Sequence, residues 1–461
     1  MAILLLVFVI AVIALTLFEH RVGGDWDSRP VGDAEDVAAL ANRDDVNVLF
    51  ILIDTMRAER LGSYGYERDT SPVIDRLAAS GIRFERHLAQ STWTKTSMAS
   101  LWTGLLPTHT GISRFDHVIP EAANMAVEVF RNAGFLTVGL YRNGWVAPTF
   151  GFDQGFAIYQ RPGPAPMAPG IRRENPTVSD RSTDEGIFEA AVEFLRVNAN
   201  ERFFLYIHLM DLHEYIYDEH SALFGSSYSD VYDNSIRWTD DSIGIMLERL
   251  GMLGLLDKTV IAIASDHGEA FLERGFEGHA RRVFRETTEV PFLISLPFRL
   301  EPGVEVKTRT ANVDIWPTIF ELLGLESPTE IDGRSRMPDI AAELSGIPLD
   351  DKVRVSIADL DQNWAKRDSE PLPTIAVVEG PYRYVRVAHE GEEEATEVLF
   401  DAREDPLERV DQSEAEPETL ARMRAAADEY RAQQPSWGDS PTRELGELEL
   451  NLLRALGYQV E

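Results

Sequence analysis

Five short runs of apolar residues, rich in β-branched and aromatic types, recur along the chain with helix-like sequence between them. The first run, VNVLFILID, is apolar at almost every position, which is typical of a strand buried on both faces of a sheet. Strands that alternate with helices indicate an α/β fold with a largely parallel sheet covered on both sides. The predicted strands cover residues 46–54, 136–141, 202–211, 259–269 and 290–297, and two of the predicted helices cover residues 71–81 and 184–199.

The sequence changes character after about residue 350. The segments TIAVVEGPYRYVRVAHEG and ATEVLFD predict antiparallel strands, and PETLARMRAAADEYRAQ predicts a helix. The tail TRELGELELNLLRALGY predicts a further amphipathic segment, and the Pro- and Gly-rich QRPGPAPMAPGIRRENP predicts a surface loop. We therefore expect a main domain over residues 46–350 and a smaller α+β subdomain over residues 351–461.

The N-terminus, MAILLLVFVIAVIALTLF, has only one polar residue, Thr16, between its first and last positions. A bilayer span needs about 20 apolar residues, and the segment lacks the basic start and the cleavage site of a signal peptide. We expect a single-pass membrane anchor over residues 1–20 and an acidic linker over residues 21–45. The main domain is expected outside the cytoplasm, although Arg21 alone points the other way by the positive-inside rule.

Charge and composition exclude several functions. The formal net charge is −33, which argues against a nucleic-acid partner because phosphate backbones need clustered Lys and Arg. The chain has no cysteine, so disulfides, thiol nucleophiles and cysteine-based zinc sites are excluded.

Side chains that can bind a metal follow three of the predicted strands where each strand ends. Ligands of parallel α/β sheets bind at this edge, so these side chains are expected to lie close together. Oxygen and imidazole donors suit Zn, Mn or a similar divalent ion. The residues are Asp54 after the first strand, His208, Asp211 and His213 at the third, and Asp266, His267 and Glu269 at the fourth.

Several motifs in order resemble the sulfatase family of the alkaline phosphatase superfamily. They are NVLFILIDTMRAERLGSYGY, GLLPTHTGI, ASDHGE, GFEGHA, VDIWPTIFELLGLESPTEIDGRS and the C-terminal PYRYVRV and EVLFDAREDPLERVD. The resemblance runs from about residue 47 to the end of the chain. It implies an alkaline-phosphatase-like, mostly parallel sheet flanked by helices.

The resemblance also identifies a candidate nucleophile. Sulfatases carry a Cys or Ser ten residues before the glycine that ends the segment STWTKTSMASLWTG, and that residue becomes formylglycine. Here the position is Thr94, which cannot be converted in this way. Threonine nucleophiles occur in phosphotransferases and phosphatases of the superfamily, including phosphoethanolamine and lipoteichoic-acid transferases. We expect Thr94 to attack the substrate, since a hydroxyl on a divalent ion is activated and a helix start favours anions; a simple helix cap is the alternative.

The chain departs from the sulfatase pattern at several positions. Thr55 stands where the family has a second Asp, and Thr96 and Met98 replace a Pro and an Arg near the nucleophile. Two lysines of the sulfatase pattern are missing. Residues 280–282 occupy the region of one of them, and Asn143 lies near the position of the other. The Asn143 amide can donate to a developing oxyanion in phosphoryl or sulfuryl transfer.

The resemblance and the strand ends together predict the site. Its expected metal ligands are Asp54, Thr94, Asp266 and His267, around one ion of Zn, Mn or Ca. His213 is expected to serve the leaving group, and Arg57 either orients the site or forms a surface salt bridge. Alternatively, a second ion or the substrate is bound by the remaining candidates, which are Asp211, His208, His279 and Arg281.

The predicted function is that of a membrane-anchored, metal-dependent hydrolase or phosphotransferase of the sulfatase type. The substrate is expected to be a phosphate or sulfate ester of a small molecule, a glycan or a lipid headgroup, bound by loops within residues 144–185 and 214–235. Two alternatives stay open: a true sulfatase that tolerates threonine, and a binding protein that kept the fold and lost activity. The sequence does not indicate an oligomeric state.

Overall fold

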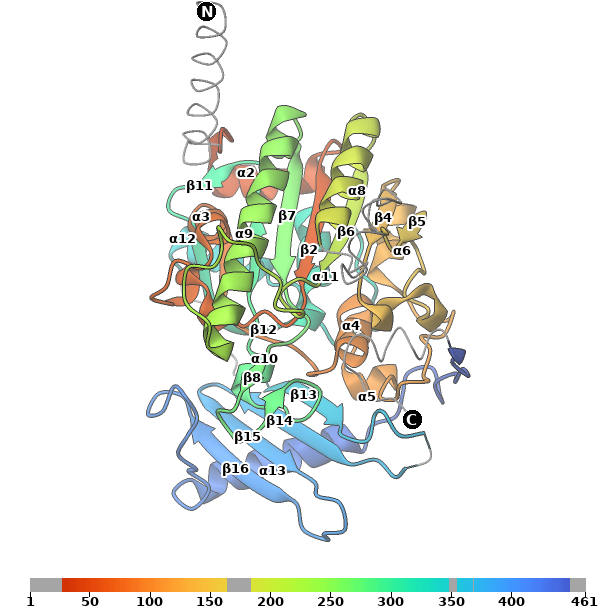
Figure 1. The fold of residues 1–461 in the computed structure, drawn as a ribbon, viewed down its shortest axis with the longest axis vertical. Helices are drawn as coiled ribbons and strands as arrows, with labels where there is room; N and C mark the ends of the chain where they lie inside the picture. The colour runs from red at the N-terminus through yellow and green to blue at the C-terminus, as the bar shows by residue number, and fades with distance from the viewer. Residues whose placement is uncertain (1–26, 164–183, 348–354, 368, 448–461) are drawn as a thin grey trace, which may run out of the picture.

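An eight-stranded sheet forms the centre of the larger part of the molecule (Figure 1). The computed structural model describes residues 27–163, 184–347, 355–367 and 369–447. The strands lie in the order β12–β3–β10–β7–β2–β6–β4–β5. Their bounds in that order are Val304–Ala311, Ile82–Leu88, Phe292–Ser295, Thr259–Ala264, Asn47–Ile53, Phe203–Leu209, Leu136–Leu140 and Ile158–Gln160.

Most neighbouring strands of this sheet are parallel, and β10 is the exception because it runs antiparallel to both β3 and β7. The predicted α/β class is therefore confirmed, with a mixed and mostly parallel sheet. Strands β7, β2 and β6 are adjacent and parallel, so their carboxyl ends meet at one edge. This arrangement brings together the ends of three strands that are far apart in the sequence.

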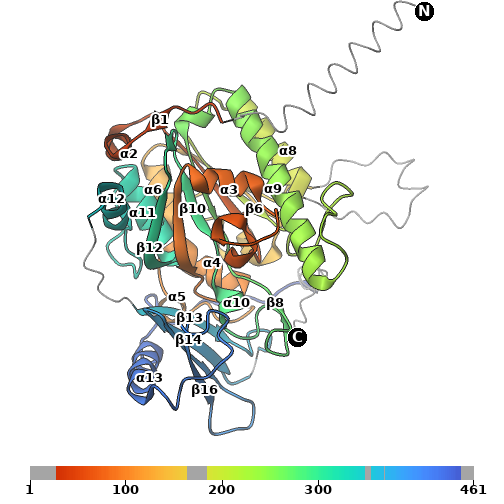
Figure 2. The same cartoon turned by 90° about the vertical axis from the view of Figure 1, so that its left-hand side faces the viewer.

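Two hydrophobic cores lie on the two faces of the sheet, and β2 contributes alternate side chains to them. Phe50 and its even-numbered neighbours belong to one core, and Ile51 and its odd-numbered neighbours to the other. Figure 2 shows α11 and α12 on one side of the sheet and α8 and α9 on the other. The helices of the first layer are α2 (Ala34–Ala39), α4 (Thr94–Thr103), α6 (Ala126–Asn132), α11 (Ile315–Leu322) and α12 (Met337–Ser345); those of the second are α3 (Pro72–Ala79), α8 (Asp184–Val197) and α9 (Tyr228–Met252).

Short elements complete this part of the chain. They are the strand pairs β1 (Val31–Gly32) with β11 (Arg299–Leu300) and β8 (Ala270–Phe271) with β9 (Glu277–Gly278), and the helices α5 (Pro107–Thr110) and α10 (Arg285–Thr288).

A second, four-stranded sheet follows in the C-terminal part, with the antiparallel order β13–β14–β15–β16. One face packs against helix α13 and the other against the larger core. The predicted antiparallel strands and helix are present, and the expected domain boundaries stay predictions. The bounds are Val355–Asp361, Pro373–Glu379, Tyr382–Val387 and Thr396–Asp401 for the strands and Pro417–Arg431 for the helix.

Asp240 of α9 ties this helix to the start of α3. Its two carboxylate oxygens accept the backbone N–H groups of Val73 and Ile74, each at 2.9 Å. Burial raises the pKa of Asp240 to about 8, against the opposing effect of these two N–H donors.

This raised pKa leads to a pH-dependent stability. The folded state keeps a proton on Asp240 that the unfolded chain releases near pH 3.8. The stability that depends on this proton is therefore complete below pH 3.8 and is lost as the pH rises toward 8. We expect the free energy of unfolding of the native protein, relative to Asp240→Asn, to fall by at least about 1 kcal/mol between pH 5 and pH 8. Urea unfolding at both pH values measures the change, with half-exposed Asp241→Asn as the control. Parallel curves for native protein and Asp240→Asn would contradict it.

The predicted membrane localisation is corrected by the structure. Within the described residues, no helix combines the length and the apolar character that crossing a bilayer requires. The longest helix described, α9, alternates buried apolar side chains with charged ones. The anchor expected over residues 1–20 lies outside the described residues, as do most of the predicted loop at 160–176 and most of the predicted amphipathic tail.

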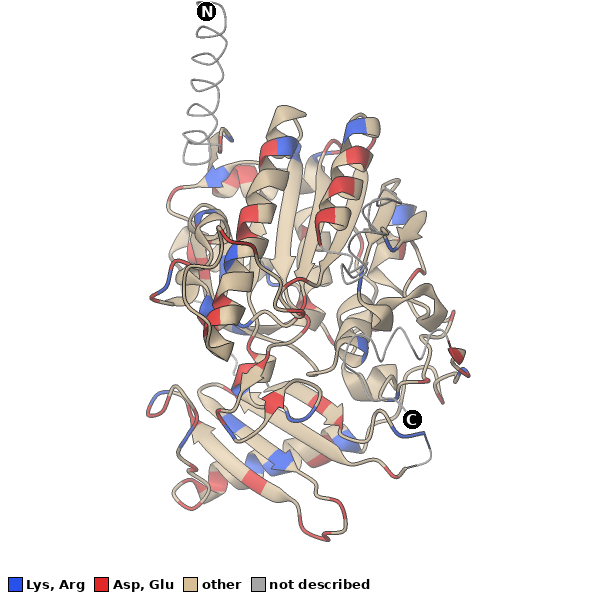
Figure 3. Ribbon diagram, in the orientation of Figure 1, with Lys and Arg blue, Asp and Glu red and all other residues tan. Residues whose placement is uncertain are grey.

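Residues of both charge signs are distributed along the described part of the chain. In the view of Figure 3, Lys and Arg are scattered among Asp and Glu and form no continuous basic stripe.

Candidate active site

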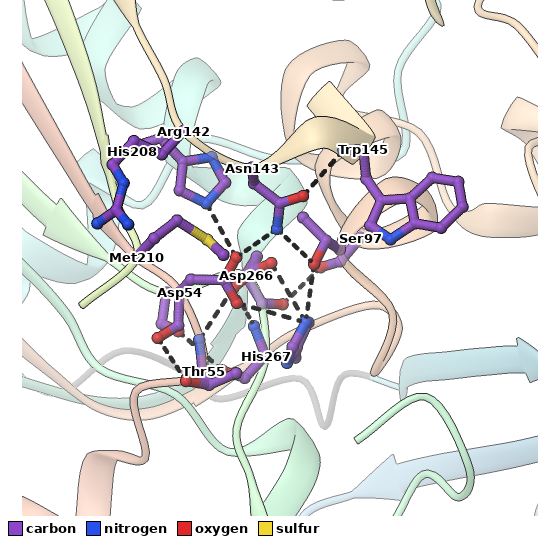
Figure 4. A network of polar contacts seen from close by, with 12 residues as sticks. Asp54, Thr55, Ser97, Arg142, Asn143, Trp145, His208, Met210, Asp266 and His267 are labelled. Atoms are coloured by element: carbon purple, nitrogen blue, oxygen red, sulfur yellow. Dashed lines mark hydrogen bonds and ion pairs between the residues drawn. The ribbon is translucent and has the colours of Figure 1, made fainter. Parts of the chain in front are cut away.

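The candidate site lies where β2, β6 and β7 end. Asp54 directly follows β2, His208 is the next-to-last residue of β6, and Asp266 and His267 follow β7. All four side chains are fully buried. Figure 4 shows them converging with Asn143, which comes from the loop after β4.

Thr94 is the first residue of α4, and its hydroxyl faces this cluster. Its Oγ1 lies 3.2 Å from His267 Nε2 and 3.3 Å from Asn143 Nδ2. Ser97, one turn along the helix, donates its hydroxyl to the backbone carbonyl of Asp266 at 2.6 Å. The helix ends at Gly104, whose φ of +70° a glycine adopts without strain. The start of the helix is thereby tied to the end of β7.

Hydrogen bonds of the two buried histidines assign them different roles. His267 Nδ1 lies 3.0 Å from the Gly268 carbonyl, so Nδ1 carries the proton and Nε2 presents a lone pair to the cluster. His208 Nε2 lies 3.1 Å from Asp54 Oδ2, and its Nδ1 lies 2.8 Å from the hydroxyl of Tyr206. His208 Nε2 therefore donates to the carboxylate, and the Tyr206 hydroxyl holds the ring in this orientation.

Two buried carboxylate oxygens of the cluster, Asp54 Oδ1 and Asp266 Oδ2, accept no hydrogen bond. They lie 3.8 Å and 3.3 Å from His267 Nε2. Burial and the nearby Asp54 charge raise the pKa of Asp266 to about 7. Burial opposes ionisation of Asp54 too, but the His208 hydrogen bond and neighbouring histidines outweigh it and lower its pKa.

These open acceptors fit a divalent cation, because buried carboxylates without donors need a positive partner. The ligand atoms that would bind the cation are Asp54 Oδ1, Asp266 Oδ2, His267 Nε2 and Thr94 Oγ1. Asp54, His208 and Asp266 form another candidate group, with one ligand atom each within 4.8 Å of the others. We favour the set with His267, since the His208 nitrogen that faces the cluster is a donor.

Two further histidines continue outward from the cluster. The ring of His279 stacks on His267 with centroids 4.5 Å apart, and the ring of His213 lies 5.0 Å from that of His279. The buried carboxylate of Glu269 lies 3.1 Å from His279 Nδ1. Burial raises the pKa of Glu269 to about 7 and lowers that of His213.

The structure does not bring three of the sequence-predicted residues into the cluster. Asp211 faces away, because its carboxylate accepts from Arg142 at 2.5 Å and from the Trp238 indole at 2.8 Å. Arg57 is only 4% exposed, but it forms ion pairs with two partly exposed carboxylates, Glu59 and, at 2.6 Å, Glu273. It also donates to the Glu269 carbonyl at 2.9 Å from behind the site. Arg281 is exposed; burial lowers the pKa of His279 to about 4, and the charge of Arg281 adds a smaller effect in the same direction.

Sequence reasoning missed residues that hold the site from behind. Tyr206 is one whose signal was available, since it lies two positions before His208 and a strand points both to one face. Ser265 accepts the N–H of Met56 at 2.9 Å and donates to the His267 carbonyl at 2.8 Å, which joins the loops after β2 and β7. Nothing in the sequence pattern indicates this bond.

The profile of the sulfatase family matches residues 46–325 of the chain, which include every residue of the cluster. The chain belongs to the sulfatase family. Among curated relatives of this sulfatase-family protein, human N-acetylgalactosamine-6-sulfatase is 27% identical over 343 residues, covering 64% of this chain and 65% of that protein. Steryl-sulfatase of Rattus norvegicus is 22% identical over 402 residues, covering 63% and 70%.

Solved structures agree with this sulfatase fold. Phosphonate monoester hydrolase of Agrobacterium radiobacter superposes with a TM-score of 0.68 at 16% identity, covering 87% of this chain and 100% of that one. A 2-O GAG sulfatase superposes with a TM-score of 0.67 at 19% identity, covering 87% and 98%. At these identities the likeness establishes the fold alone.

Proposed function

We propose that this sulfatase-family protein is a metal-dependent hydrolase or phosphotransferase that uses Thr94 as its nucleophile. The single observation that carries the proposal is the Thr94 hydroxyl beside two buried carboxylate oxygens without donors and the open nitrogen of His267. A threonine that only capped the helix would not need buried carboxylate oxygens and a histidine nitrogen beside its hydroxyl.

In the proposed reaction, Thr94 Oγ1 releases its proton to solvent and forms a bond to the phosphorus or sulfur of the ester, and the bond to the leaving oxygen breaks. A divalent ion held by Asp54, Thr94, Asp266 and His267 would lower the pKa of the Thr94 hydroxyl and stabilise negative charge on the transferred group. Water, or a second alcohol in a transferase, then takes the group from Thr94.

Three side chains support this chemistry around the nucleophile. Asn143 Nδ2 donates to Asp54 Oδ2 at 2.7 Å and also reaches Thr94 Oγ1, so it orients both groups. His213 is proposed to protonate the leaving oxygen, since it lies at the outer end of the histidine row. Arg57 is proposed to position the Glu269 backbone rather than to contact substrate.

The proposed substrate is a sulfate, phosphate or phosphonate ester of a small molecule or a glycan. Sulfate esters are supported by the family and by the names of its relatives, and phosphonate or phosphate esters by the hydrolase neighbour and the threonine hydroxyl. We propose one bound ion of Zn, Mn or Ca, because Thr55 offers no carboxylate where the family has one.

The purified protein should hydrolyse at least one of four p-nitrophenyl esters, namely the sulfate, the phosphate monoester, the phosphodiester and the phenylphosphonate. Preference for the sulfate ester would favour the true-sulfatase alternative over phosphoryl transfer. EDTA should remove turnover, and re-addition of one equivalent of ion should restore it. No turnover together with no stoichiometric ion by mass spectrometry would favour the inactive binding protein instead.

A further inference from the structure

The backbone takes a strained turn directly after Asp54. Thr55 has a φ of +63°, which a β-branched residue rarely adopts. Its hydroxyl donates to the Asp54 carbonyl at 2.6 Å, and its N–H points to Asp266 Oδ1 at 3.4 Å. The turn therefore links the backbone of Asp54 to the carboxylate of Asp266, and something must hold it in this conformation.

Tyr232 of α9 reaches this turn from outside the sheet. Its hydroxyl donates to the Thr55 carbonyl at 2.7 Å and accepts the backbone N–H of Arg57 at 2.9 Å. The side chain is fully buried, and its ring packs edge-on against Phe271, with centroids 4.8 Å apart. The hydroxyl thus closes the turn on both sides of Met56.

We propose that Tyr232 is a positioning residue whose hydroxyl holds the left-handed turn at Thr55 and so fixes the direction of the Asp54 carboxylate. Without the Tyr232 hydroxyl, the Thr55 carbonyl and the Arg57 N–H each lose this hydrogen-bond partner, and both residues are buried. The turn then relaxes toward negative φ, and Asp54 no longer points its open oxygen toward His267. This role rests on the proposed metal site.

The test is the affinity of the full chain for Mn²⁺, measured by calorimetric titration of protein stripped with a chelator. We expect Tyr232→Phe to weaken binding by about 10- to 100-fold, the usual effect of losing a group that orients a metal ligand. Circular dichroism of each variant checks that the fold is retained.

Tyr64→Phe is the matched control. The Tyr64 hydroxyl also bonds to backbone carbonyls, of Phe84 and Phe292 at 3.1 Å, and also accepts a backbone N–H, that of Phe292 at 3.0 Å. Tyr64 lies farther along the segment that follows β2, in the short helix Gly62–Tyr64, and its hydroxyl ties that segment to β3 and β10 without touching the turn at Thr55. Its loss should change stability without changing the affinity for Mn²⁺.

Thr55→Gly tests the cause, because glycine adopts a positive φ without strain. Combined with Tyr232→Phe, it should bring the affinity back to within about threefold of the Thr55→Gly protein alone. An unchanged affinity in Tyr232→Phe, an equal loss in Tyr64→Phe, or no recovery with Thr55→Gly would each overturn the role of Tyr232. A native protein that binds no divalent ion would overturn the proposed function as well, so the two failures are distinguishable.

Discussion

Thr94→Val is expected to lower kcat by about 10⁴-fold or more, because valine has the shape of threonine and lacks the attacking oxygen. The residue is fully buried, and its hydroxyl reaches His267 and Asn143. The fold should be retained, since the methyl groups of valine fill the same space. The measurement is kcat on the best ester of the four, with the protein saturated in divalent ion.

Two variants control this result. Thr94→Ser keeps a hydroxyl and should retain measurable turnover, although serine is held less rigidly. Thr103→Val removes the hydroxyl at the other end of the same helix, where it donates to the Ala99 carbonyl at 2.7 Å, and should leave kcat nearly unchanged. If Thr94→Val kept more than a tenth of the native kcat, Thr94 would not be the nucleophile.

Asp266→Asn is expected to remove the stabilisation that a divalent ion provides, and to make the ion-free protein more stable than the native chain. In the native protein an ion at 100 times its Kd should add about 2.7 kcal/mol to the free energy of unfolding. Without the ion, Asp54 and Asp266 repel each other in a buried site, and burial with that repulsion raises the pKa of Asp266 to about 7. Asparagine removes one of the two charges and one ligand oxygen.

Thermal unfolding at neutral pH, with EDTA and with excess Mn²⁺, separates the two effects. Asp211→Asn is the control, since Asp211 is also a buried acid just past a strand but bonds to Arg142 and Trp238. It should lower Tm in both conditions and leave the rise caused by Mn²⁺ unchanged. A full Mn²⁺-induced rise in Asp266→Asn would contradict the proposed ligand set.

The strands predicted from the sequence are those buried on both faces, such as β2 and β7, where apolar residues run without interruption. Strands β3 and β12 were missed. Their sequences, IRFERHL and VEVKTRTA, place charged residues between apolar ones, because these strands lie toward the edge of the sheet and expose part of each strand. Pairing with β10 and with each other makes them strands.

The sequence by itself indicated the α/β class, the family resemblance and the candidates Asp54, Asp266 and His267, and the resemblance added Thr94. The first three were within reach because strand ends are local features, and their polar residues stand out against apolar runs. The tertiary structure alone decided that His208 donates to Asp54, that Asp211 bonds to Arg142, and that Tyr232 donates to the Thr55 carbonyl. The reason is physical: which oxygen of a buried carboxylate stays open depends on donors from distant segments, and chain order does not specify those contacts.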